Sequence, residues 1–238
     1  MTGFILKLIA AASMLADHMN KLIIIPFGLA DKIGINILGH SIGLPFLLGL
    51  FGRLSFPIFA FLISEGARHT SDIKKYICRI MIFAVISEIP FSLAFSPGNA
   101  LQGQNVMFTF LIALCAIYIS GKSTEKILIP AAALAAMLAA KLLRTDYGAY
   151  GVLLVLIFYY FEKKLSIPLF AAAVIAYYGR RISTGSVSYI LEAASVIMAA
   201  VPVLLYSGKR GPRLKWLFYI FYPAHISVLL ILRIMMLT

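Results

Sequence analysis

Charged residues are scarce in this 238-residue chain. Asp, Glu, Lys and Arg together make up 13% of it, and only 9 residues are acidic. Soluble globular proteins carry about 25% charged and about 45–50% apolar residues, whereas 62% of this chain is hydrophobic. This composition excludes an ordinary soluble domain and predicts a protein that crosses a membrane several times.

The chain is also poor in cysteine and in familiar catalytic motifs. Cys78 and Cys115 both fall within apolar runs, and neither spacing nor context indicates a disulfide or a metal site. No Walker pattern, GxSxG elbow or HExxH sequence occurs, which argues against the usual NTPase, serine hydrolase and zinc protease mechanisms. No internal repeat is visible, so the inverted-repeat signature of many secondary transporters is missing too.

The basic residues lie between the apolar runs. The net charge is +12, from 21 Lys and Arg against 9 Asp and Glu, but there is no compact basic domain, so we expect no nucleic acid partner. Alternate gaps between the runs are richer in Lys and Arg. The positive-inside rule assigns those gaps to the cytoplasm and thereby predicts a cytoplasmic N-terminus.

Apolar runs long enough to form membrane helices recur along the whole chain. A spanning helix needs about 20 mostly apolar residues. We expect an all-α polytopic membrane protein with about nine transmembrane helices in one bundle, and an interfacial segment at Gly34–Gly43. The nine runs are Phe4–Ile25, Leu44–Ser64, Ile77–Phe95, Val106–Ser120, Ile127–Leu143, Tyr150–Phe161, Ile167–Tyr178, Val187–Tyr206 and Trp216–Leu237.

An adjacent acid and histidine, Asp17 and His18, lie inside the first run. An ionised Asp near a helix centre costs roughly 2.5–3.5 kcal/mol on insertion scales, so such a group is expected to have a partner or a function. One interpretation is a structural pair between Asp17 and Lys21, which share a helix face at i, i+4 spacing. His18 points about 100° away and needs its own partner or a polar cavity.

Other ionisable residues occur deep in later runs. Arg53 keeps its charge, so it must meet an acid or an anion. Asp17 and Glu88 are the acids that we expect to pair with it, whereas Glu192 lies early in its run and is given less weight. A structural ion pair is the alternative to a functional role for Arg53.

His225 lies in the middle of the last run, after Tyr222 and Pro223. Pro223 frees a backbone carbonyl one turn earlier. His225 is interpreted as a ligand, as a proton carrier or as a residue that only forms a hydrogen bond between helices. Counting 1.5 Å per residue places Asp17, His18, Arg53 and His225 within roughly 8 Å of one level, so a shared cavity is possible.

Two loop motifs add further candidates. Asp146 and Tyr147 lie in LLRTDYGAYG, where Asp146 is alternatively a helix N-cap. The segment YSGKRGPRLK carries Lys209, Arg210 and Arg213 between glycines. These cations suit phosphate binding, or serve only as a topology signal.

Several motifs occur together in a characteristic order. They are LKLIAAASMLADH, GRLSFPIFAFLISEG, KKYICRIMIFAVISEIPF, NVMFT, TDYGAYG, YSGKRG and FYIFYPAH. Together they resemble the TraX family, multi-spanning bacterial membrane proteins whose name-giving members N-acetylate conjugative pilin. The resemblance covers nearly the whole chain. It implies a single domain over residues 1–238, related to the transmembrane acyltransferases and located in the bacterial inner membrane.

The resemblance implies transfer of an acetyl group from acetyl-CoA to an amine or hydroxyl, with no metal. The acceptor is expected to be a pilin-like peptide, a lipid or a glycan, and membrane lipids surround the protein. We assign catalysis to His18 as general base with Asp17 in support, and oxyanion stabilisation to Arg53 or His225. A direct transfer and a covalent acetyl-His route both remain open.

The remaining candidate residues are assigned to binding. Lys209, Arg210 and Arg213 are expected to hold the CoA phosphates, and the acceptor is assigned to Glu88, Asp146, Tyr147 and Tyr222. Buried Asp, Glu and His also suit a proton-coupled transporter. A non-catalytic membrane assembly factor is the third hypothesis.

Overall fold

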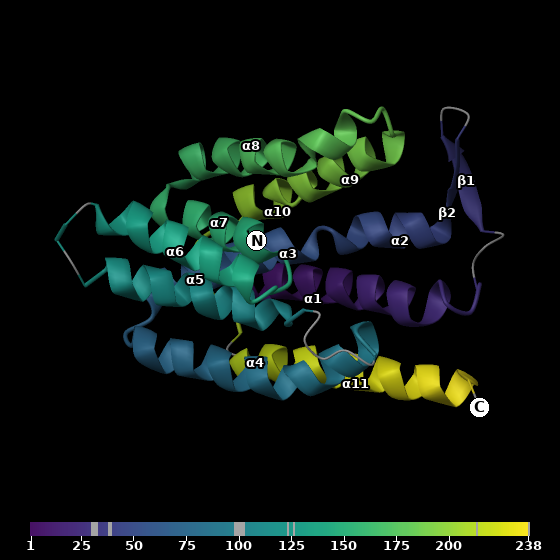
Figure 1. Cartoon of the computed structure of the whole chain (residues 1–238), viewed down its shortest axis with the longest axis horizontal. Coiled ribbons are helices and arrows are strands. Elements are labelled where there is room, and N and C mark those ends of the chain that lie inside the picture. Colours follow the sequence, from purple (N-terminus) through teal and green to yellow (C-terminus); the bar gives the residue numbers. More distant parts are fainter. Residues whose placement is uncertain are drawn as a thin grey trace. The chain divides into compact units, whose positions relative to one another are not determined.

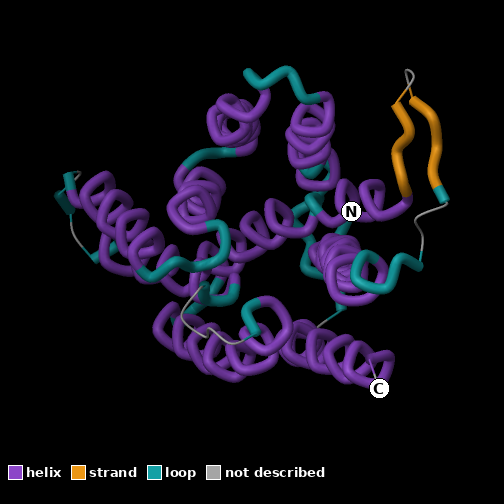
Figure 2. The backbone as a smooth tube through the Cα atoms, turned by 45° about the vertical axis from the view of Figure 1, so that its right-hand side comes forward, coloured by secondary structure: helices purple, strands orange, loops and turns teal. Residues whose placement is uncertain are grey.

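A computed structural model describes residues 1–29, 33–37, 40–97, 103–122, 124–125, 127–212 and 214–237. In these ranges the chain forms eleven α-helices, one π-helix and one pair of strands (Figure 2). The all-α membrane fold is therefore confirmed, with a single hairpin as the departure from it. Each of the nine predicted apolar runs is helical over nearly all of its length.

The chain divides into two compact units. Unit 1 comprises Met1–Phe59 and Val174–Thr238, and unit 2 comprises Ala60–Ala173. Two helices, α3 (Ser55–His69) and α8 (Lys163–Ile182), pass from one unit into the other. The single domain over residues 1–238 stays a prediction.

Unit 1 begins with α1 (Gly3–Met19), which is coloured purple in Figure 1. The Thr2 hydroxyl caps it by accepting a hydrogen bond from the Ile5 backbone N–H. Helical structure continues directly into the π-helix η1 (Asn20–Ile24). Such π-turns often mark functional sites because they displace the side chains that follow from the regular helical register.

The segment predicted to lie at the membrane interface is a β-hairpin. Its antiparallel strands are β1 (Gly34–Ile37) and β2 (His40–Gly43), with Gly34 paired to Gly43. Leu38 and Gly39 between them lie outside the described residues. The hairpin leads directly into α2 (Leu44–Gly52).

The second apolar run is broken in the middle. Helix α2 ends at Gly52, and α3 begins at Ser55 after a turn that contains Arg53. Discontinuous helices at membrane depth commonly form binding sites, because their free backbone groups face a cavity or neighbouring protein. The rest of unit 1 consists of the end of α8, then α9 (Val187–Met198), α10 (Ala200–Leu204) and α11 (Lys215–Leu237).

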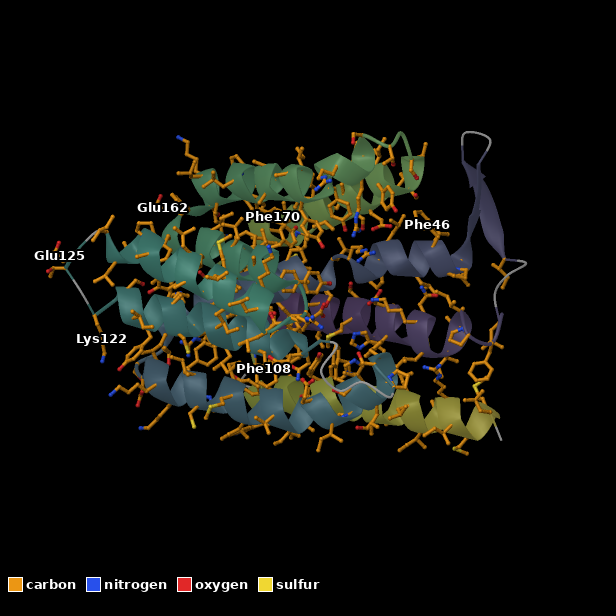
Figure 3. All side chains as sticks on the ribbon, viewed as in Figure 1. Phe46, Phe108, Lys122, Glu125, Glu162 and Phe170 are labelled. Carbon is orange, nitrogen blue, oxygen red and sulfur yellow. The ribbon has the colours of Figure 1, made fainter. Side chains whose placement is uncertain are left out.

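Unit 2 is a helical cluster. Helix α5 (Val106–Ser120) packs against α4 (Ile73–Phe95), α6 (Leu128–Leu142) and α7 (Gly148–Tyr160). The buried Phe158 ring meets Phe61 edge to face at 5.7 Å and lies 5.4 Å from Phe170. The side chains of Lys122, Glu125 and Glu162 lie toward the same end of this unit, apart from one another (Figure 3).

Four helical stretches of the described chain are long and apolar enough to cross a membrane. They are Leu44–His69, Ile73–Phe95, Val187–Leu204 and Trp216–Leu237. Helices α5, α6 and α7 are apolar but shorter. The positions of the predicted runs are confirmed, but fewer of them than the expected nine meet this criterion in the described chain. Helices α1, α5, α6 and α7 are too short, and α8 is 20 residues long but has basic residues at both ends.

Candidate functional site

Unit 1 brings two distant histidines into direct contact. His18 Nδ1 on α1 lies 2.7 Å from His225 Nε2 on α11. The two ring planes are parallel within 9°, with centroids 5.0 Å apart. His225 is buried, whereas His18 is partly exposed. The histidine that the sequence placed mid-run therefore supplies the partner that His18 required.

A backbone carbonyl fixes the direction of this hydrogen bond. His225 Nδ1 lies 2.7 Å from the Phe221 carbonyl oxygen, which can only accept, so Nδ1 carries the proton. With both rings neutral, His225 Nε2 accepts a hydrogen bond from His18 Nδ1. His18 then carries its lone pair on Nε2. The order Phe221, His225, His18 thus selects one tautomer of His18 and orients its ring.

Aromatic side chains surround the histidine pair. Phe221 stacks on His225 at 4.6 Å and 12°. The buried Tyr222 ring lies 5.9 Å from His225 and 6.5 Å from His18. Tyr222, assigned to acceptor binding, is therefore beside both catalytic candidates. Both nitrogens of His225 are engaged by Phe221 and His18, which favours a positioning role over the predicted oxyanion role.

Asp17 faces a different neighbour. Its carboxylate lies 2.6 Å from Lys21 Nζ, the i, i+4 pair that was one of the two interpretations. Gly52 of α2 presses against it, and a Cβ at Gly52 would lie 2.5 Å from Asp17 Cβ. Ser13, one turn earlier on α1, donates to the Phe51 carbonyl at 2.5 Å. Asp17 therefore lies in the contact between α1 and α2.

Arg53 pairs with an acid that was not expected. Its Nη2 atom lies 3.0 Å from Glu192 Oε2 on α9. The predicted pairing with Asp17 or Glu88 was wrong, because the rotation of each helix about its axis decides which acid faces α2. Ser195, also on α9, donates to the Leu50 carbonyl at the end of α2. Neighbouring helices thus satisfy backbone groups at the α2–α3 break.

The basic loop is hydrogen-bonded to the start of α1. Gly3 N–H donates to the Lys209 carbonyl at 2.8 Å, and Phe4 N–H donates to the Arg210 carbonyl at 3.0 Å. Gly211 has φ +74°, and a Cβ there would lie 2.9 Å from Thr2 Oγ1. The Lys209 and Arg210 side chains are exposed. Arg213, the third predicted phosphate ligand, lies outside the described residues.

Glu88 belongs to unit 2, where it binds the start of α5. Its carboxylate accepts hydrogen bonds from Asn105 Nδ2 at 2.6 Å and from the Asn105 backbone N–H at 3.0 Å. Ser92 donates to it at 3.0 Å. Asn105 itself caps α5. Glu88 therefore has a structural role in this unit, and its assignment to the acceptor stays a prediction.

Asp146 and Tyr147 also belong to unit 2. Tyr147, with φ +63°, occupies the N-cap position of α7, so the alternative that made Asp146 the cap was wrong by one residue. The Asp146 backbone N–H donates to the Gln104 carbonyl at 2.8 Å, and its carbonyl accepts from Thr109. A non-glycine residue in the left-handed region stores strain, which is often found at functional sites.

No metal cluster is present in the described ranges. There, no group of three or more His, Cys, Asp or Glu side chains is arranged to hold an ion. The site that the structure assembles is instead an oriented histidine pair, an ion pair at a helix break and a basic loop. All three lie in unit 1.

A sequence profile described as TraX protein matches residues 2–233. The chain belongs to the TraX family. A curated relative is the probable fimbrial assembly protein FimC, serogroup H1, of Dichelobacter nodosus. It is 32% identical over 199 residues, which cover 76% of this chain and 81% of the relative. No solved structure matches the chain. The resemblance read from the motifs is confirmed, and the chain is a membrane protein of this family.

Proposed function

We propose that this protein is a membrane acetyltransferase that uses acetyl-CoA as its donor. The hydrogen-bonded pair of His18 and His225 carries the proposal. A general base needs a fixed tautomer and an orienting partner, and Phe221 and His225 provide both for His18. Histidine suits this task because its ordinary pKa of about 6.5 lies near the working pH.

The proposed reaction is a direct acyl transfer. The acceptor nitrogen or oxygen attacks the thioester carbonyl carbon while His18 Nε2 takes its proton. The tetrahedral intermediate collapses with cleavage of the C–S bond, and the imidazolium returns the proton to the CoA thiolate. The products are the acetylated acceptor and CoA. His225 acts through His18 and is a positioning residue.

The basic loop is proposed to bind the acetyl-CoA donor through its positive charges. CoA carries three phosphate groups, and Lys209 and Arg210 offer charge-assisted contacts on a loop held by the N-terminus. Arg213 remains assigned to the same group by its sequence position. In this proposal the loop lies on the cytoplasmic side of the bacterial inner membrane, where acetyl-CoA is made, with the N-terminus beside it.

The proposed acceptor of the acetyl group follows from the name of the curated relative. The curated relative is named a probable fimbrial assembly protein, which supports a pilin-like peptide amine as acceptor and a role in pilus production. A lipid or glycan hydroxyl would undergo the same chemistry. In either case we assign the acceptor to Tyr222, next to the histidine pair.

Acetyl transfer by the purified protein tests the proposal. Protein in nanodiscs is incubated with acetyl-CoA labelled in the acetyl group and a membrane fraction or pilin peptide. We expect transfer that falls at least a hundredfold in His18→Gln, on the order expected for loss of a general base. The exposed His69 provides the matched control as His69→Gln. Full activity in His18→Gln would overturn the mechanism.

A non-catalytic assembly factor is the second candidate, favoured by the name of the relative. It predicts that His18→Gln leaves pilus production intact, whereas changes to helix packing abolish it. The acetyltransferase predicts that His18→Gln lowers pilus production as well. Counting pili in cells that carry each variant separates the two.

A further inference from the structure

Two side-chain contacts join α1 to α11, one near the basic loop and one at the histidine pair. At one end, Lys7 Nζ on α1 lies 5.5 Å from the centre of the Phe218 ring on α11. At the other end, His18 contacts His225. We call these four residues the α1–α11 seam. The contacts advance in the same direction on both helices, so α1 and α11 run parallel (Figure 1).

The spacing within each helix places both pairs on one face. Lys7 and His18 are eleven residues apart, close to three full turns of about 3.6 residues. Phe218 and His225 are seven residues apart, close to two turns. Each helix therefore presents its two seam residues in a row toward the other. Lys7 and His18 are separated by about 16 Å along α1, at about 1.5 Å per residue.

The Lys7 end of the seam is strongly positive. The Phe4 N–H donates to the Arg210 carbonyl at 3.0 Å, which places Arg210 at the start of α1, one turn before Lys7. Backbone bonds from Gly3 and Phe4 to the loop keep Arg210 and Lys209 at the start of α1. Holding like charges together costs free energy, which a bound anion relieves. Phe218 and the exposed Trp216 add aromatic surface at the same end.

We infer that an acyl-CoA binds along the α1–α11 seam, with its phosphates at Lys7 and its thioester at His18. The inference rests on the proposed function, because it takes the bound anion to be the acyl donor. A phosphopantetheine arm extends over roughly the distance between Lys7 and His18. Ala11 and Met14 between them are buried, so the arm runs along the edge of the seam and not through it.

The test measures binding separately from turnover. Dissociation constants for CoA and for adenosine 3′,5′-bisphosphate are measured in phosphatidylcholine nanodiscs. Lys7→Gln is expected to raise both about tenfold, as for loss of one charge-assisted contact. Lys122→Gln is the matched control, since Lys122 also lies over an aromatic ring, that of Tyr118, at 4.6 Å. His18→Gln should leave the constant for adenosine 3′,5′-bisphosphate unchanged, because this fragment lacks the arm that extends to His18.

A truncated donor sharpens the test. Lys7→Gln should raise the KM for acetyl-CoA with kcat unchanged. With S-acetyl-N-acetylcysteamine, which lacks the phosphates, wild type and Lys7→Gln should turn over equally. Equal CoA affinity in wild type and Lys7→Gln would overturn the seam while leaving a His18-dependent transferase standing.

Two further outcomes separate the seam from the transferase. Lys7-dependent CoA binding without any acetyl transfer would overturn the proposed function and leave a nucleotide site at Lys7. Phosphatidylglycerol added to the nanodiscs tests the other source of phosphate. If it abolishes CoA binding, the basic end is a lipid headgroup site and the inference is wrong.

Discussion

His225 Nε2 lies 2.7 Å from His18 Nδ1 although the two residues are 207 positions apart in the chain. The Phe221 carbonyl fixes the proton on the far side of His225, so the pair has one polarity. His18 therefore presents Nε2 as its basic atom. This arrangement follows from the packing of α11 against α1 and η1.

The positioning role of His225 predicts a graded response to substitution. His225→Ala removes the acceptor for His18 Nδ1 and should lower kcat by about a hundredfold. His225→Gln keeps an acceptor in reach and should restore part of that loss. The pH profile of kcat should shift between wild type and His225→Gln, because the partner of the base has changed. Equal profiles and equal rates in all three proteins would contradict the role.

Gly52 is predicted to be intolerant of a side chain. A Cβ there would lie 2.5 Å from Asp17 Cβ and 2.9 Å from Asp17 Oδ1. Gly52→Ala should therefore destabilise the protein by about 1–3 kcal/mol, typical of overpacking. Gly49→Ala is the control, because its Cβ meets Asn20 Nδ2 at an ordinary 3.9 Å. Thermal unfolding in detergent measures both, and equal Tm values for the two variants would refute the close contact.

The Arg53–Glu192 pair predicts a non-additive mutant cycle. Removing either residue deletes this ion pair in unit 1, so Arg53→Met and Glu192→Gln should each lower stability by about 1–3 kcal/mol. This is less than for a fully buried pair, since Arg53 is partly exposed. The double variant should lose less than the sum of the two. Strict additivity of the changes in Tm would show that the two charges do not interact.

Asp72 gives a pH-dependent helix end outside the membrane spans. The Lys75 backbone N–H donates to its carboxylate, and this bond holds the pKa of Asp72 below its usual value. A depressed pKa stabilises the folded cap above the unfolded pKa of about 3.9, and this stabilisation is lost as the pH falls through the folded pKa. Hydrogen exchange in the first turn of α4 should quicken over that acid range.

Asp72→Asn separates the cap from its charge. Asparagine caps a helix about as well as aspartate but does not titrate. The variant should therefore keep the first turn of α4 protected at neutral pH and show no acid-dependent change there. Protection that falls with acid to the same degree in both proteins would assign the effect to another group.

Much of the helical fold was predictable from the sequence, for a simple physical reason. Long apolar runs must satisfy their backbone groups internally in a membrane, and helices do so. The runs therefore marked the helices well, including the early one that holds His18. The hairpin after residue 33 was not found, because strands of four residues are too short for their alternation to identify them.

The partners of the site residues were harder to predict. Counting residues along each helix placed Asp17, His18, Arg53 and His225 near one level. The rotation of each helix about its axis, however, determines which of these side chains face each other. The rotation of α2 and α9 about their axes brings Arg53 to Glu192, with which it forms an ion pair. Lys7 was missed although its eleven-residue spacing from His18 was readable from the sequence. The signal became meaningful only when Phe218 and His225 were found on the facing helix.

The most direct test of the account is mass spectrometry of acetyl marks in cells. Pilin, lipids and glycans are compared between cells with the wild-type protein, without it, and with His18→Gln or the control His69→Gln. The account predicts one acetylated species that is present with wild type and His69→Gln and absent in the other two. An acetyl profile that is identical in all four strains would contradict acetyl transfer as the function of this protein.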